Sequence, residues 1–69
     1  MIYSVRWRAT SDEIEYRSSN HLSTAEATDF ACSVLDQMEV SDIAVVDGGG
    51  QKVVGMPEII RYWRHRKAW

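Results

Sequence analysis

The sequence is poor in the residues that small domains use as covalent or metal staples. Its one cysteine is Cys32, so no disulfide can form within the chain. The other imidazole or soft ligands are His21 and His65, and no two of these side chains stand at a spacing typical of zinc sites. We therefore expect no disulfide framework, no metal site and no cofactor. A single cysteine also fits a reducing compartment.

Long hydrophobic runs are missing as well. No stretch approaches the roughly 18 apolar residues of a membrane-spanning helix, and residues 1–9 lack the apolar core of a secretory signal. No linker, repeat or low-complexity segment divides the 69 residues. The sequence therefore predicts a single small domain, residues 1–69, located in the cytoplasm and without contact to a membrane.

The formal net charge is −2, which argues against a domain that binds nucleic acid through bulk positive charge. The charges are unevenly distributed, however. Residues 24–42 contain no lysine or arginine and carry five acids, namely Glu26, Asp29, Asp36, Glu39 and Asp42. Residues 56–69 carry Arg61, Arg64, Arg66 and Lys67 against Glu58 alone. This asymmetry suggests that an acidic and a basic region could pair, within one chain or between chains.

Two stretches near the start alternate apolar and polar residues, which is typical of half-buried strands. They cover residues 2–9 and 13–19, and the apolar members are Tyr3, Val5, Trp7, Ala9, Ile14 and Tyr16. A turn centred on residues 11–12 places Trp7 opposite Tyr16, with all apolar residues on one face. Because a slip of one residue would separate them, we predict an antiparallel hairpin in this register. The same register places Arg8 opposite Glu15 on the other face.

The next segment has the signals of a helix. Ser23 and Glu26 form the S-x-x-E pattern of a capping box at its start. An apolar face at helical spacing follows, made by Ala27, Phe30, Ala31, Val34, Leu35 and Met38. Asp29 and Asp36 fall on the opposite side, where we expect solvated carboxylates. The pattern predicts a helix over residues 24–38.

A second hairpin is indicated by residues 42–55. The continuous apolar run 43–46 is typical of a strand that is covered on both faces, and the glycines at 48–50 suit a turn. A loop of two or four residues pairs Val46 with Gln51, whereas a loop of three pairs it with Lys52. Apolar residues fall on both faces in either case, so the pattern leaves the register open.

The last helix is predicted over residues 57–66. Pro57 at the first helical position and Glu58 in the first turn favour a start here. The element order ββαββα predicts an α+β fold with a four-stranded antiparallel sheet in the order 2-1-3-4. The long helix covers the apolar face of that sheet. The short C-terminal helix is expected to cap the fourth strand, extend the core, or cover part of the other face.

No set of catalytic residues emerges from the sequence. The stretch GGGQK lacks the spacing of a phosphate-binding loop and precedes a strand. Cys32 lies on the flank of the apolar helix face, where a buried structural cysteine is common, and no orienting group accompanies it and a histidine. The helix carboxylates oppose the apolar face and so are expected in water rather than in a pocket. We therefore expect a protein that is not an enzyme.

The C-terminal segment interleaves cations and aromatics and is the candidate binding region. Its residues are Arg61, Arg64, Arg66, Lys67 and Trp69. Such a segment can grip phosphates and stack on bases, can contact a protein partner, or can simply be a packed helix whose basic end complements the helix dipole. The leading hypothesis is a small non-enzymatic protein-interaction domain that binds a protein partner or itself as a homodimer. The alternative is nucleic-acid binding through residues 61–69.

Overall fold

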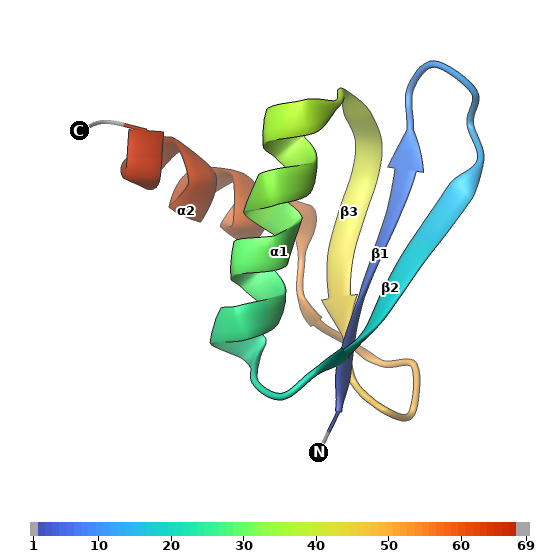
Figure 1. Ribbon diagram of the computed structural model, residues 1–69, viewed down its shortest axis with the longest axis vertical. Helices are drawn as coiled ribbons and strands as arrows, with labels where there is room; N and C mark the ends of the chain where they lie inside the picture. Colours follow the sequence, from blue (N-terminus) through green and yellow to red (C-terminus); the bar gives the residue numbers. More distant parts are fainter. Residues whose placement is uncertain (1, 68–69) are drawn as a thin grey trace.

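The chain forms one antiparallel sheet with two helices on the same side of it (Figure 1). The computed structural model describes residues 2–67. Ala68, Trp69 and the side chain of Lys67 lie outside the described residues. The elements are β1 (Tyr3–Ala9), β2 (Glu15–His21), α1 (Thr24–Gln37), β3 (Val40–Val46), β4 (Lys52–Val54) and α2 (Met56–Lys67). The α+β architecture predicted from the sequence is confirmed.

The strand order is β2-β1-β3-β4, as the alternating chain directions and the apolar third strand predicted. The order places β1 and β3 inside and leaves β2 and β4 at the edges. β3 begins at Val40 and is longer than the apolar run 43–46. A register shift near Ala9 lets Val40 join the core. The two inner strands therefore form the surface against which α1 packs.

The first hairpin has the predicted register, with Trp7 opposite Tyr16 and Arg8 opposite Glu15. The rings of Trp7 and Tyr16 stack with centroids 5.8 Å apart. The connecting turn is held by Asp12, whose carboxylate accepts hydrogen bonds from the Ile14 N–H at 3.0 Å and the Tyr16 hydroxyl at 2.7 Å. These two bonds lower the pKa of Asp12, and the bond to Asp12 raises the pKa of Tyr16.

The second strand is displaced from its predicted range. It begins at Glu15 because Glu13 has a left-handed backbone (φ 56°), and it runs on to His21 through an irregularity at Asn20 (φ 73°). This irregularity is a bulge, which inserts a residue and re-aims the side chains that follow. His21 is consequently buried on the helix side, where its ring lies 5.0 Å from that of Phe30.

The long helix begins and packs as predicted. Ser23 accepts a hydrogen bond from the Glu26 N–H at 3.1 Å, while the Glu26 carboxylate accepts one from the Leu22 N–H at 3.3 Å. The apolar face of α1 lies on β1 and β3. Ala27 and Ala31 are fully buried in this contact. Because their side chains are single methyl groups, the helix backbone can approach the sheet closely.

β3 is apolar on both faces. Within residues 2–67, however, no helix covers the face that points away from α1 and α2. Ile43 and Val45 belong to the core under α1. Ala44 and Val46 point to the opposite face and are nevertheless buried, at 1% and 0% exposure. These two side chains are short and lie on an inner strand, so larger neighbours on the flanking strands can cover them. Arg6, for example, is the direct neighbour of Ala44.

The second hairpin uses a three-residue loop and pairs Val46 with Lys52, one of the two registers left open. The Asp47 carboxylate accepts hydrogen bonds from the Gly49 and Gln51 N–H groups, each at 2.9 Å. Gly50 has a positive φ of 83°, a conformation that favours glycine. The hydrogen bonds to Asp47, which precedes the glycines, therefore favour the three-residue loop. The pattern of apolar residues could not reveal these bonds.

The C-terminal helix extends the helical layer and does not cover the other face of the sheet. It packs beside α1 and against β3 (Figure 1). Its first helical hydrogen bond runs from the Ile59 N–H to the Gly55 carbonyl at 3.1 Å, so the helix starts one residue before the predicted position. Ile59 is fully buried and joins the core, whereas most other described residues of α2 are exposed.

Candidate functional site

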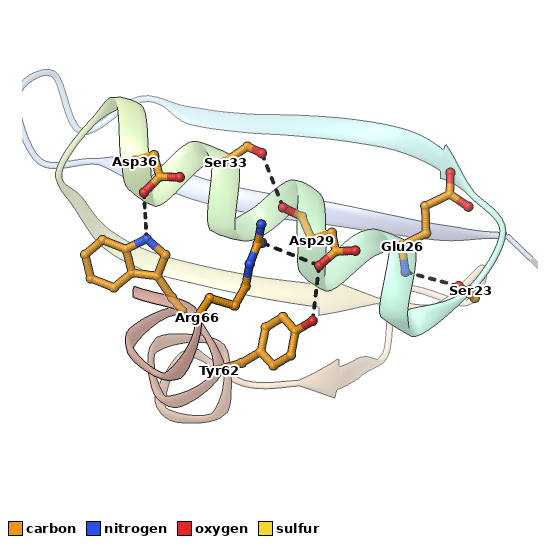
Figure 2. A network of polar contacts seen from close by, with 8 residues as sticks. Ser23, Glu26, Asp29, Ser33, Asp36, Tyr62 and Arg66 are labelled. Atoms are coloured by element: carbon orange, nitrogen blue, oxygen red, sulfur yellow. Dashed lines mark hydrogen bonds and ion pairs between the residues drawn. The ribbon is translucent and has the colours of Figure 1, made fainter. Parts of the chain in front are cut away.

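Polar side chains of α1 and α2 meet along one seam (Figure 2). The hydroxyl of Tyr62 donates to Asp29 Oδ1 at 3.3 Å, and Arg66 Nη1 lies 3.5 Å from the same oxygen. The Trp63 Nε1–H donates to Asp36 Oδ1 at 2.9 Å. The acidic helix and the basic helix therefore pair within one chain, one of the two arrangements that their charges suggested.

Helical spacing explains this seam. Asp29 and Asp36 are two turns apart, so they lie on the same side of α1. Tyr62 and Arg66 are one turn apart on α2, which lets both side chains reach one carboxylate. The carboxylates were expected to be solvated. They are exposed, as predicted, and in addition they accept hydrogen bonds from α2.

The thiol of Cys32 lies beneath the same seam. The residue is 1% exposed, and burial raises the pKa of its thiol, an effect that the nearby Arg66 guanidinium partly opposes. Burial therefore favours the neutral thiol over the thiolate at this position. His21, the histidine closer to it in sequence, contacts Ser18 and Phe30 instead. Within residues 2–67, no three His, Cys, Asp or Glu side chains are grouped to hold a metal ion.

Beside the seam lies an open groove of about 470 Å³. One wall comes from the end of α1 and its connection into β3, and the other wall comes from α2. Its lining is mainly apolar and comprises Leu35, Met38, Val40, Met56, Ile60 and Trp63, with Asp36, Gln37, Glu39 and Arg64 also contributing. An apolar groove with a few charged groups has the general character of a ligand or partner site.

The charges around the groove have opposite signs on its two walls. Glu39 comes from the connection between α1 and β3, and Arg64 comes from α2; both are exposed. The third charged residue, Asp36, is bonded to Trp63 and so stabilises the groove's own wall. Met38 is 38% exposed, which makes it the accessible apolar residue of the α1 wall.

Among the predicted C-terminal site residues that the structure describes, the three arginines do not gather on one surface. Arg61 and Arg64 are exposed and lie within about 60° of each other around α2, at 100° per residue. Arg66 instead turns toward α1 and contacts Asp29 (Figure 2). Trp69 and the side chain of Lys67 lie outside the described residues. Of the predicted set, Arg64 alone lines the groove among the residues that the structure describes.

The groove residues were not identified from the sequence as a site. A signal was present, because Met56, Ile60 and Trp63 recur at positions i, i+4 and i+7 of α2 and form an apolar stripe. The α1 side, with Met38 and Val40, belongs to the helix end and the following strand, so no single periodicity includes it. Only the packing of α2 beside α1 brings these walls together.

A second surface is the face of the sheet opposite the helices. Its charged residues, placed by the strand registers, are Arg6, Arg8, Glu15, Arg17, Asp42 and Lys52. Arg8 lies between two acids, Glu15 and Asp42, whereas Arg6 lies directly opposite Arg17. An ion pair at 3.8 Å joins Arg6 to Glu15 diagonally. Arg6 and Arg17 therefore each have a cation as their direct cross-strand neighbour.

Comparisons with family models, curated proteins and solved structures found no match to the chain. Across the described part of the chain, neither helix has the length and apolar character required to cross a membrane.

Proposed function

We propose that the chain is a non-enzymatic protein-interaction domain, which binds an amphipathic helical segment of another protein in the groove between α1 and α2. The observation that carries this proposal is the apolar lining of the groove at the point where the two helices meet β3. A helix-in-groove contact needs an apolar trough to receive residues at positions i, i+3, i+4 and i+7 of the partner.

The chemistry of the walls supports a protein ligand. Two of the lining residues, Met38 and Met56, are flexible and polarisable, so they can adapt their shape to a partner's side chains. Trp63 is fixed by its bond to Asp36, and it offers a large aromatic surface of the type that anchors interfaces. The nearby carboxylates Asp29 and Asp36 accept hydrogen bonds from α2 and hold this helix beside α1.

The charges define the partner further. A segment with a basic residue near Glu39 and an acidic residue near Arg64 would complement the two walls, and this polarity would fix its direction in the groove. The partner is thus an apolar-faced helix with charges of opposite sign at its flanks. A segment of uniform charge would meet repulsion at one wall.

Nucleic-acid binding through Arg61, Arg64, Arg66, Lys67 and Trp69 stays a prediction, and the contacts of α2 favour it less. The guanidinium of Arg66 is engaged with Asp29, so phosphate binding would compete with an internal contact. A steep fall in affinity with salt for single- or double-stranded probes would be its signature.

The proposal can be tested with a displayed library of amphipathic helices of about 15 residues, selected on the full chain. The tightest peptide is synthesised and titrated into ¹⁵N-labelled protein. We expect amide shifts confined to residues 35–40 and 56–64. Met38→Glu should weaken binding by at least about tenfold, because it places a charge against the apolar face of the peptide.

Leu22→Glu is the matched control, since Leu22 is 73% exposed, does not line the groove, and undergoes the same type of substitution. It should bind the peptide like the unaltered protein. Shifts that map to the sheet, or equal affinity for both variants, would contradict the proposal. If concentrating the protein alone shifts the groove amides, the occupant is a second copy and the proposed partner is wrong.

A further inference from the structure

The two edges of the sheet differ greatly in what they expose. β4 is three residues long, so its free edge is short. β2 is seven residues long, and its outer edge carries no strand within the described chain (Figure 1). An edge of this length is a template for pairing with another strand. The free edge of β2 is therefore the candidate for a second interface.

The regular part of this edge is symmetric about Tyr16. Glu13 on one side and Asn20 on the other have positive φ values, 56° and 73°, and both interrupt a straight strand. Between these interruptions, the stretch Ile14–Ser18 can pair without distortion, because Ser19 already belongs to the bulge. Its middle residue is Tyr16, so a copy of the same stretch in antiparallel orientation matches it best at this residue.

The backbone groups have the phase that such a pairing requires. The Ala9 N–H donates to the Ile14 carbonyl, which makes Ile14 and, two residues on, Tyr16 the residues that bond inward to β1. Glu15 and Arg17 therefore direct their N–H and C=O groups to the free edge. In a pairing centred on Tyr16, residue 15 of one copy lies opposite residue 17 of the other, so these outward groups bond one another.

The side chains agree with the backbone. In this register each Glu15 lies opposite an Arg17 of the second copy, on the face of the sheet away from the helices, and the pair occurs twice by symmetry. We propose that two copies of this chain associate through their β2 edges in this antiparallel register and form one continuous eight-stranded sheet. The contact is isologous, so it closes as a dimer instead of growing into a filament.

The pairing also supplies neighbours for two groups of side chains that lack favourable contacts in the single chain. Arg17 has the cation Arg6 as its cross-strand neighbour, and the second copy supplies a carboxylate on its other side. On the helix side, Ile14 is 54% and Tyr16 37% exposed, although both lie on the apolar face of the hairpin. In this register Tyr16 lies opposite Tyr16 of the second copy, which lengthens the stack that Trp7 and Tyr16 begin, and Ile14 lies diagonally beside the second copy's Tyr16.

This interface lies on the sheet edge and does not use the groove between α1 and α2. It therefore stands independently of the proposed function. Loss of peptide binding in the groove would leave the dimer intact, and a monomeric protein could still bind the peptide. The two proposals are read out by different measurements, namely peptide affinity and molecular mass.

The test is sedimentation equilibrium of the full chain over a range of concentrations, with charge reversals at the edge. The unaltered chain should show a monomer–dimer equilibrium. Glu15→Arg and Arg17→Glu should each weaken dimerisation by at least about tenfold, because each creates two like-charge pairs across the two-fold axis. Mixing these two variants should restore dimers, since every pair across the mixed interface again joins opposite charges.

Lys52→Glu makes the same change of charge as Arg17→Glu on the other edge strand, and it should dimerise normally. Circular dichroism establishes that each variant is folded, and the mixing experiment shows directly that each is competent to pair. A chain that stays monomeric at about 1 mM, where even weak specific complexes form, overturns the proposal. So does a dimer that is indifferent to both reversals, or a mixture that forms no more dimer than its components.

Discussion

The two helices lie side by side on the same sheet but are attached to it in different ways. α1 is joined to β1 and β3 by an apolar face, within which Ala27, Ala31 and Val34 are buried. α2 buries only Ile59 fully among its described residues; the partly buried Met56 also packs against the core, and the polar seam joins α2 to α1 (Figure 2). One helix is thus part of the core, and the other is docked on it.

This difference has an energetic consequence. Burial of apolar side chains stabilises by about 1.5–3 kcal/mol for each large residue, whereas an exposed ion pair contributes about 0–1 kcal/mol. Because the two carboxylates of the seam, Tyr62 and Arg66 are exposed, α2 should open more readily than α1. The groove has one wall on each helix, so a bound partner should hold α2 in place.

The largest expected effect is in the core under α1. Ile43→Ala removes a fully buried side chain from the inner strand and should lower the free energy of unfolding by about 2–5 kcal/mol. Val53→Ala, at a residue that is 42% exposed on the edge strand, should change it much less. Urea denaturation measures both. Equal losses would show that the core does not lie between α1 and the inner strands.

The close approach of α1 to the sheet gives the next effect. Ala31→Leu should cost about 1–3 kcal/mol of stability, because a larger side chain at this fully buried position would push the helix away. Ala25→Leu makes the same change at an exposed position of the same helix and should stay within about 0.5 kcal/mol of the unaltered chain. A neutral or stabilising Ala31→Leu would mean that space remains under the helix.

The polar seam should give a smaller effect. Asp29→Asn removes the charge that faces Arg66 and keeps an oxygen for the Tyr62 hydroxyl, so it should cost less than about 1 kcal/mol. The loss should shrink further in high salt, because the pair is exposed. Thermal melts at low and high salt measure it. A salt-independent loss above about 2 kcal/mol would place far more of the stability in the seam than its exposure permits.

The smallest effect concerns alkaline pH. Burial raises the pKa of the Cys32 thiol above its unfolded value, and hydrogen bonding to Asp12 does the same for Tyr16. For a raised pKa, the stabilisation is complete below the unfolded pKa and is lost as pH rises through the folded pKa. Stability should therefore decline from about pH 9 upward. The decline should flatten in Cys32→Ala and flatten further with Tyr16→Phe; an unchanged slope in both would contradict this assignment.

Much of the core helix and the first hairpin could be predicted because their signals are local. Ser23 caps α1 through a bond to a residue only three positions away, and the alternation around Trp7 and Tyr16 admits one register alone. The strand order followed from chain direction together with one doubly apolar strand. These properties need no knowledge of how distant elements are packed.

The position of α2 could not be predicted, and the groove depends on it. The sequence left several places for this helix, because a single buried residue, Ile59, does not fix where a helix docks. The basic residues attracted attention as a binding segment, yet Arg66 is used internally. Its partner Asp29 lies 37 positions away in sequence, a separation that no local pattern records.

Native-state amide hydrogen exchange tests the contrast between the helices most directly. It gives an opening free energy for each protected amide, which can be compared with the free energy of global unfolding. We predict that the amides of β1, β3 and α1 exchange through global unfolding, while those of α2 exchange through an opening of lower free energy. If the amides of α2 and α1 give the same opening free energy, the second helix belongs to the core and the contrast drawn between them is wrong.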